Sequence, residues 1–365
     1  MENTKIGNKE AIALLVTITF NHIIVSLTKT IVETTASASL LNILIVGIIT
    51  LIFACIICYF LNKFPTFDLI DISNYLGGNV LKWIVGLLYV GYFIFFAGVL
   101  LHIFSSFLQI VYFPMSKVFY IILLFVIATF TSCNMRHNAI YRSTFIIFPL
   151  LIISTLFLFF SNIQYYEFEK IYPLFGKGYF ETFVLGLSNM FAFQGLAYIY
   201  FMPTILKEPT KIKHIAVTSI VLSCIFLLIG ISIILFMFNA FIETDALLPL
   251  YSASKYIEFG PFFQKLGSAF ILIWIIAFIS YLCINLKFSS TILRKLSNIN
   301  NETIFTFLLS IGLLFASLWP KNYAISTFFA NNVYKYSFFI LVIGFTFLIL
   351  LLATLKQKIR GWFNK

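Results

Sequence analysis

The chain has 365 residues, of which 61% are hydrophobic and only 10% are charged. A water-soluble domain has about a quarter of its residues charged, so this composition excludes a soluble fold and predicts a polytopic membrane protein. The formal net charge of +11 does not indicate nucleic-acid binding, because the basic residues lie in short clusters between apolar runs, as membrane topology produces.

Ten apolar runs are predicted to cross the bilayer, which takes about 20 residues in each case. Turns rich in Pro, Asn, Lys and Gly separate the runs, as in "LNKFPTFD" and "LKEPTKIKH". We therefore predict an all-α fold in which residues 1–365 form a single integral membrane domain. The spans are 10–30, 38–61, 81–108, 118–133, 140–161, 183–206, 213–240, 264–291, 303–319 and 334–355.

The distribution of Lys and Arg predicts the orientation of these spans. With the N-terminus inside, 16 of the 24 basic residues fall on the inside, a two-to-one excess. Because cytoplasmic loops carry more Lys and Arg, both termini are predicted to be cytoplasmic. The basic residues predicted to lie outside are Lys29, Lys117, Lys170, Lys177, Lys255, Lys265, Lys321 and Lys335.

Two of the predicted outside loops are long, 162–183 and about 241–263. The second contains "LLPLYSASKYIEFGPF", which predicts a short amphipathic helix on the membrane surface with Leu250, Tyr251 and Tyr256 facing lipid. On the inside, "TFDLIDISNYLGG" predicts a similar surface helix.

Spans 1 and 6 share an interruption. In span 1, "TFNHIIVSLTK" places Asn21 and His22 within an apolar stretch, and in span 6 Gln194-Gly195 interrupts "NMFAFQGLAYIYFMP". Broken helices at matching positions of two halves indicate an inverted-repeat transporter with its binding site at the breaks. The repeats would cover about 10–161 and 183–355.

An alternative interpretation is that these polar residues only pack between helices, as is common in membrane bundles. The suspected break in span 1 contains no Gly or Pro, which favours this alternative there. Span 6 contains Gly195, which supports a true break.

Four segments in order carry a resemblance to a known family. They are "LLYVGYFIFF", "FAFQGLAYIYFMP", "LLPLYSASKYIEFGPFFQKLGSAFILIW" and "SLWP". The whole chain resembles the B subunit of endospore germinant receptors, the spore germination permeases of the amino acid–polyamine–organocation superfamily. The resemblance implies a LeuT-like fold of ten helices in a 5+5 inverted repeat. It also implies binding of a small germinant, often an amino acid, with A and lipoprotein C subunits as partners in the inner membrane of the spore.

The chain departs from the pattern of this family at both breaks. The family often has Gly-x-Gly and then Pro in the first span, where this chain has Asn21, His22, Ile23 and Thr28. In span 6 the family pattern is Phe-x-Gly-x-Glu, whereas the chain reads "FQGLA" from Phe193 and lacks the acid. The ligand chemistry is therefore expected to differ from that of better-known members.

The LeuT-like arrangement implied by the resemblance places spans 1, 3, 6 and 8 around the binding site. Among the four histidines only His22 lies at depth, where a polar group is a functional candidate. Span 8 offers Ser280, Tyr281 and Asn285, of which Ser280 is preferred. The predicted ligand contacts are Asn21, His22, Ile23, Ser26, Tyr92, Phe96, Phe193, Gln194, Gly195 and Ser280.

No nucleophile–base pair, metal cluster or phosphate loop is visible in the sequence, so we expect neither an enzyme nor a cofactor or metal. Cys55 and Cys58 form a C-x-x-C without partner ligands nearby. The 13 acidic residues fall in loops or near span ends, which argues against proton coupling. Two functions stay open: a germinant-binding sensor, or a secondary transporter that moves its ligand. Sodium coupling through Ser280 and carbonyls at the first break also stays open.

Overall fold

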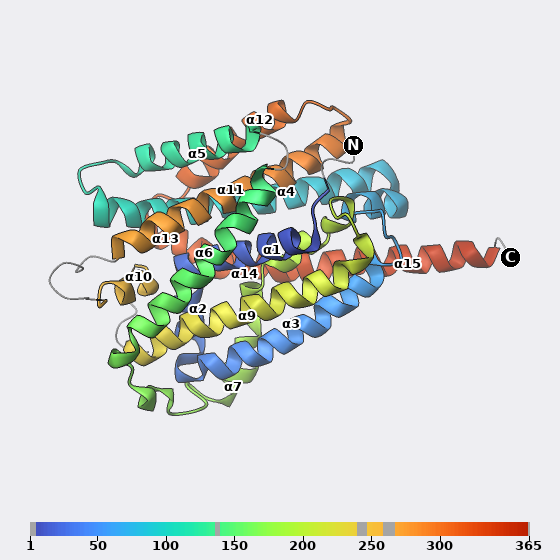
Figure 1. Cartoon of the computed structure of the whole chain (residues 1–365). Helices are drawn as coiled ribbons and strands as arrows, with labels where there is room; N and C mark the ends of the chain where they lie inside the picture. The colour runs from blue at the N-terminus through green and yellow to red at the C-terminus, as the bar shows by residue number, and fades with distance from the viewer. Residues whose placement is uncertain (1–4, 136–138, 239–246, 258–266, 364–365) are drawn as a thin grey trace.

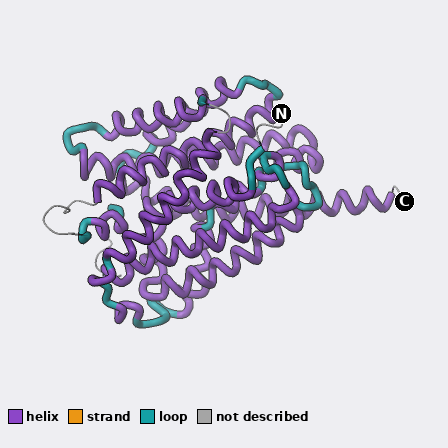
Figure 2. Tube along the Cα trace, in the orientation of Figure 1, coloured by secondary structure: helices purple, strands orange, loops and turns teal. Residues whose placement is uncertain are grey.

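The computed structural model describes residues 5–135, 139–238, 247–257 and 267–363. Within these residues the chain is helical apart from loops and one isolated backbone bridge between Ile6 and Leu206 (Figure 2). By length and composition, six helical stretches among them could cross a membrane. The first of these holds two predicted spans.

The helices form one bundle with α1 near its centre (Figure 1). Helix α1 packs on α9 and α6, α3 packs on α9, and α4 packs on α11 and α12. The first residues of α1 and the C-terminal end of α15 lie at the same end of the bundle, which we call the inner end (Figure 1). The helices are α1 (Asn8–His22), α2 (Thr28–Thr35), α3 (Ser39–Leu61), α4 (Leu69–Tyr112), α5 (Val118–Asn134), α6 (Ala139–Ser161), α7 (Tyr179–Phe183), α8 (Gly195–Ile199), α9 (Ile212–Met237), α10 (Pro249–Ser254), α11 (Gly267–Ser297), α12 (Glu302–Leu318), α13 (Tyr323–Phe328), α14 (Tyr334–Ser337) and α15 (Thr346–Phe363).

Span 1 is interrupted directly after His22, but it does not unwind. Between α1 and α2, residues Ile23–Leu27 form a π-helical turn, and the flanking dihedral angles stay helical. Asn21 donates from Nδ2 to the carbonyl of Thr17, one turn back. A π turn holds one extra residue, so it changes the direction of the side chains without exposing backbone groups. The interruption expected in span 1 is thus present as a widened turn.

Span 6 is broken more completely. A short α7 is followed by a 3₁₀ segment, Leu185–Ala192, which ends at Phe193 with φ −91° and ψ 57°. Helix α8 then begins at Gly195 and lasts only to Ile199. A non-helical residue between two short helices confirms the predicted break.

Two predicted surface helices can be compared with the structure. Helix α4 begins at Leu69 and kinks at Gly77–Gly78, where Gly78 has φ +66°, so a separate helical segment precedes the span as predicted. Its position on the membrane surface was wrong, because Leu69, Ile70 and Ile72 are buried against the bundle. The prediction for α10 was wrong in part, because Leu250 and Tyr251 are buried against the bundle while Tyr256 is 48% exposed. Residues 239–246 and 258–266 of that loop lie outside the described residues.

The predicted start of span 10 was also wrong. The last helical stretch begins at Tyr323 rather than near 334, so Lys335 lies inside α14. Two π-helical turns, Phe329–Val333 and Phe338–Phe345, flank α14 on either side. Span 10 is therefore longer and less regular than predicted.

Candidate functional site

Tyr334 of α14 lies at the centre of a buried polar and aromatic cluster. Its ring stacks on Phe96 of α4 with 4.2 Å between centroids, and on His22 of α1 at 5.4 Å. The ring of Tyr92 lies 5.4 Å away. The Tyr334 hydroxyl donates a hydrogen bond to Oε1 of Gln194, at the break in span 6. Residues from four separate helical segments therefore meet at one phenol.

The polar pair that ends α1 ties this cluster to α11. His22 Nε2 lies 3.1 Å from the Tyr281 hydroxyl, and the two rings meet edge to face. One turn earlier on α11, the carbonyl of Ala277 accepts from Asn21 Nδ2 at 3.2 Å. Both residues singled out by the sequence thus bridge span 1 to span 8 at the place where span 1 widens.

Three polar atoms of the cluster have no hydrogen-bond partner among the described residues. They are Gln194 Nε2, Asn21 Oδ1 and the hydroxyl of Tyr92. Each such buried group costs about 1–3 kcal/mol relative to a paired one. Unpaired donors and acceptors on converging elements are expected where a ligand supplies the missing partners.

The structure brings five of the ten predicted residues into this cluster or its immediate border: Asn21, His22, Tyr92, Phe96 and Gln194. Gly195 has a different role, because an added Cβ would stand 3.2 Å from the carbonyl oxygen of Leu15. Its lack of a side chain lets α8 approach α1 closely, which positions Gln194.

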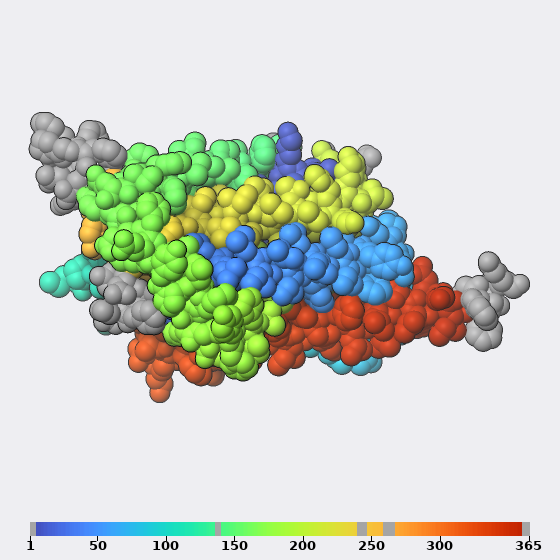
Figure 3. All heavy atoms as spheres, turned by 90° about the horizontal axis from the view of Figure 1, so that it is seen from below, coloured from blue at the N-terminus to red at the C-terminus, as the bar shows by residue number. Residues whose placement is uncertain are grey.

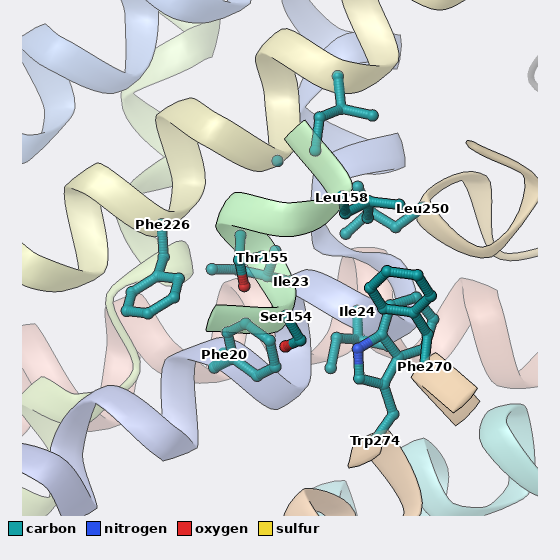
Figure 4. Close-up of a pocket in the computed structure, with 12 residues that line it drawn as sticks. Phe20, Ile23, Ile24, Ser154, Thr155, Leu158, Phe226, Leu250, Phe270 and Trp274 are labelled. Carbon is teal, nitrogen blue, oxygen red and sulfur yellow. The ribbon is translucent and has the colours of Figure 1, made fainter. Parts of the chain in front are cut away.

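The structure directs Ile23 and Phe193 elsewhere. Ile23 lines a small cavity of about 10 Å³ between α1, α6, α9 and α11, together with Phe20 and Trp274 (Figure 4). Phe193 reaches toward α3, where its Cζ would stand 3.5 Å from a Cβ added at Gly47. Both side chains therefore pack between helices, and neither is among the described ring contacts of Tyr334.

The two predicted serines also make local contacts. The Ser280 hydroxyl donates to the carbonyl of Ile276 in its own helix at 3.1 Å. The carbonyl of Ser26 accepts from Thr30, whose hydroxyl also donates to Asn331 at 2.7 Å. On α11 it is Tyr281, next to Ser280, that reaches the cluster.

Aromatic packing closes the cluster toward the inner end. Phe93 stacks on Tyr198 with 4.5 Å between centroids, and Tyr89 meets Phe201 at 5.0 Å. The Tyr198 hydroxyl donates to Asn285 Oδ1 at 2.7 Å. These contacts join α4, α8 with the residues that follow it, and α11, on the inner side of Gln194.

A charged cluster lies further inward, at the base of α4. Lys295 of α11 pairs with Asp68 at 2.5 Å and with Asp71 at 2.8 Å. The Asp68 carboxylate also caps α4 and accepts a long hydrogen bond, 3.5 Å, from Thr204 beyond α8. Burial raises the pKa of Asp68 to about 6 despite the attraction of Lys295. This ion cluster fastens α4, α11 and the end of span 6 together at the inner end.

Comparison with known proteins fits this architecture. A family model described as "Spore germination protein" matches residues 5–325. The chain belongs to this spore germination permease family. Spore germination protein B2 of Bacillus subtilis (strain 168) is 23% identical over 346 residues, which cover 92% of each chain.

Two solved transporters show the LeuT-like fold of this permease. MhsT in complex with L-phenylalanine has a TM-score of 0.70 at 16% identity, covering 95% of this chain and 88% of that chain. Mhp1, a nucleobase-cation-symport-1 family transporter in a closed conformation with bromovinylhydantoin bound, has a TM-score of 0.65 at 12% identity, covering 93% and 77%. The predicted fold class is confirmed, whereas the repeat boundaries stay a prediction.

In this spore germination permease, two of the departures noted in span 1, Asn21 and His22, lie in the cluster. Ala197, where the pattern has an acid, is fully buried. The described contacts of Tyr334, His22 and Gln194 include no charged side chain. The cluster is therefore polar and neutral among the residues that the structure describes.

Proposed function

We propose that the cluster around Tyr334 binds the germinant, a small molecule such as an amino acid, whose binding triggers germination. One observation carries the proposal: the buried carboxamide of Gln194 has Oε1 occupied by Tyr334 and Nε2 unpaired. A carboxamide offers both a donor and an acceptor, so it can engage both ends of a small ligand.

The chemistry of the cluster favours an uncharged or zwitterionic ligand. Gln194 Nε2 and the Tyr92 hydroxyl offer donors to a carboxylate, while Asn21 Oδ1 offers an acceptor to an amine. A ligand with net charge would lack a counter-ion there, and burial of an unpaired charge is expensive. The L-phenylalanine bound to MhsT is consistent with an amino acid in this fold.

Ligand binding would require Tyr334 to withdraw. Its ring fills the space between Phe96 and His22, and its hydroxyl occupies the Gln194 acceptor. The ligand and the phenol therefore compete for the same carboxamide. The flanking π turns at Phe329–Val333 and Phe338–Phe345 are places where span 10 can change register, since such turns commonly mark functional sites.

Purified protein tests the proposal directly. Thermal unfolding is measured with each proteinogenic L-amino acid in turn, because a ligand that binds only the native state raises Tm. We expect one or a few amino acids to raise Tm in the parent chain, and Gln194→Leu to need about fivefold more of the same amino acid for the same rise in Tm. An unchanged shift in Gln194→Leu would place the site elsewhere.

A transporter function is the second candidate, and the fold shared with two transporters favours it. Proteoliposomes containing the chain separate the two functions. Time-dependent accumulation of a radiolabelled amino acid that also raises Tm would indicate transport. Saturable binding without accumulation would indicate a sensor.

We also propose that the chain acts in the spore inner membrane with A and C subunits and with both termini cytoplasmic. The orientation is supported by the basic residues, because it places 16 of the 24 Lys and Arg residues on the cytoplasmic side. A cysteine introduced in 162–183 should react with an impermeant maleimide from outside, whereas one near Lys358 should not; the reverse pattern would overturn the orientation. Deletion of the A subunit should remove this chain from spore membranes, and normal levels would contradict the assembly.

A further inference from the structure

A groove lies between α3 and α15 near the inner end of the bundle, where Figures 1 and 3 show the two helices side by side. Its volume is about 490 Å³. Phe60 and two leucines of α15, Leu351 and Leu355, make its apolar wall, and Lys63 and Lys358 border it. The groove therefore has an apolar body and a basic edge.

A second groove, of about 650 Å³, runs along the other side of α3 toward α9. The two grooves meet at Phe60, which lines both of them. The second groove reaches from the level of Phe60 toward the middle of the span and carries no charged side chain. Its lining residues are Leu51, Ile52, Cys55, Ile56, Tyr59, Phe60 and Val217.

The two lysines are free to bind an external anion. The ammonium of Lys63 lies 4.5 Å from the ring centroid of Tyr59 and 5.5 Å from that of Phe60, so it is held over the wall that the grooves share. Neither Lys63 nor Lys358 has an ion-pair partner among the described residues. The sequence supplies no acid between Glu33 and Asp68 or after Glu302.

A neighbouring lysine has a different role. Lys356 Nζ donates to the carbonyls of Tyr75 and Leu76, at 2.9 Å in each case. These bonds hold α15 against the inner segment of α4. They also hold α15 in the orientation in which one of its faces lines the groove beside α3. That face carries Leu351, Leu355 and Lys358.

We propose that these grooves form a binding site for an anionic phospholipid. The phosphate lies between Lys63 and Lys358, and the acyl chains lie on the two sides of Phe60. Two unpaired ammonium groups above apolar grooves at a span end match the shape and charge of such a lipid. Basic pockets between membrane helices bind anionic head groups in this way. Zwitterionic phosphatidylcholine has the same acyl chains but a cationic choline, which the lysines disfavour.

The experiment uses the purified chain in neutral detergent, with phosphatidylglycerol and phosphatidylcholine as separate additives. Native mass spectrometry counts retained lipids, and thermal unfolding reports binding. The test variant is the double substitution Lys63→Gln and Lys358→Gln. The control, Lys9→Gln with Lys207→Gln, removes two exposed inner lysines outside the grooves.

Phosphatidylglycerol should raise Tm and stay bound in the parent chain and the control. The affinity should fall about fivefold for each lysine removed from the grooves, or about thirtyfold for both, equivalent to about 1 kcal/mol per lysine. If the double variant misfolds, Lys358→Gln alone, at an exposed position of α15, should still show the fivefold loss. Equal binding of phosphatidylcholine, undiminished binding in the variants, or an equal loss in the control would overturn the proposal.

Discussion

Substituting the two partners of the central hydrogen bond should shift the ligand response in opposite directions. In Tyr334→Phe the ring can still stack on Phe96 and His22, but the hydroxyl that bonds Gln194 Oε1 is gone. The Gln194 carboxamide then has both ends unpaired in the closed site, because its Nε2 already lacks a partner. That raises the free energy of the closed state by about 1–3 kcal/mol. A ligand that bonds this carboxamide recovers the loss, so its apparent affinity should rise about five- to 150-fold.

Gln194→Leu should act the other way. The substitution keeps the volume similar and removes both polar ends of the side chain. The closed state loses the one hydrogen bond from Tyr334, whereas the ligand-bound state loses the two that the ligand would make. The net difference is one hydrogen bond, about 1 kcal/mol, so the apparent affinity should fall about fivefold.

The assay is the germinant dose–response of spores that carry each variant, with the protein level checked by immunoblot. Tyr336→Phe is a matched control, because Tyr336 lies two residues along α14 and is 65% exposed. It should leave the response unchanged. If Tyr334→Phe leaves the half-maximal concentration unchanged, or raises it as Gln194→Leu does, the competition between phenol and ligand is refuted.

Three further changes have expected outcomes. In Gly195→Val the added side chain should crowd the Leu15 carbonyl oxygen, which lies 3.2 Å from an added Cβ, and lower the free energy of unfolding by about 1–3 kcal/mol. The protein should stay in the membrane but lose the germinant response; a parental response would contradict this. Lys295→Met leaves the buried Asp68 carboxylate without its ion-pair partner and should lower the free energy of unfolding by about 3–5 kcal/mol. Adding Asp68→Asn removes the unpaired charge and keeps a helix cap, so the double variant should regain part of that free energy. Burial raises the pKa of Asp68 to about 6, so the folded protein holds a proton on this carboxyl more tightly than the unfolded chain does. The stability that this proton contributes is complete below about pH 4 and is lost as the pH rises through 6. Asp68→Asn should flatten that part of a Tm–pH curve, and an unchanged slope would contradict the assignment.

Much of the fold can be predicted from local patterns in the sequence. Apolar runs separated by polar turns place most spans, and Gly195 marks the break in span 6. Asn21 and His22 mark the interruption in span 1, but its form depends on packing. The sequence cannot distinguish an unwound stretch from the π turn at Ile23–Leu27, since both interrupt the regular helix after the same residue.

The lipid-facing assignment of α10 failed for a related reason. Leu250 and Tyr251 give the helix an apolar face, which suits a membrane surface as well as the bundle interior. The packing of Tyr251 on Phe107, at 4.9 Å between ring centroids, decides in favour of the interior. An apolar face shows which side of a helix is buried. Whether that side packs against lipid or against other helices depends on its neighbours in the fold.

Tyr334 had no distinguishing signal in the sequence, although it lies at the centre of the proposed site. The chain has 19 tyrosines and 46 phenylalanines, so residue type alone cannot single out one aromatic ring. Helical periodicity would normally assign its face, but π turns precede and follow α14. Each such turn adds a residue and rotates the following side chains by about 100° relative to a regular helix. An apolar pattern read at a constant period therefore loses its register across span 10, and the central position of Tyr334 is found only when the helices are seen together.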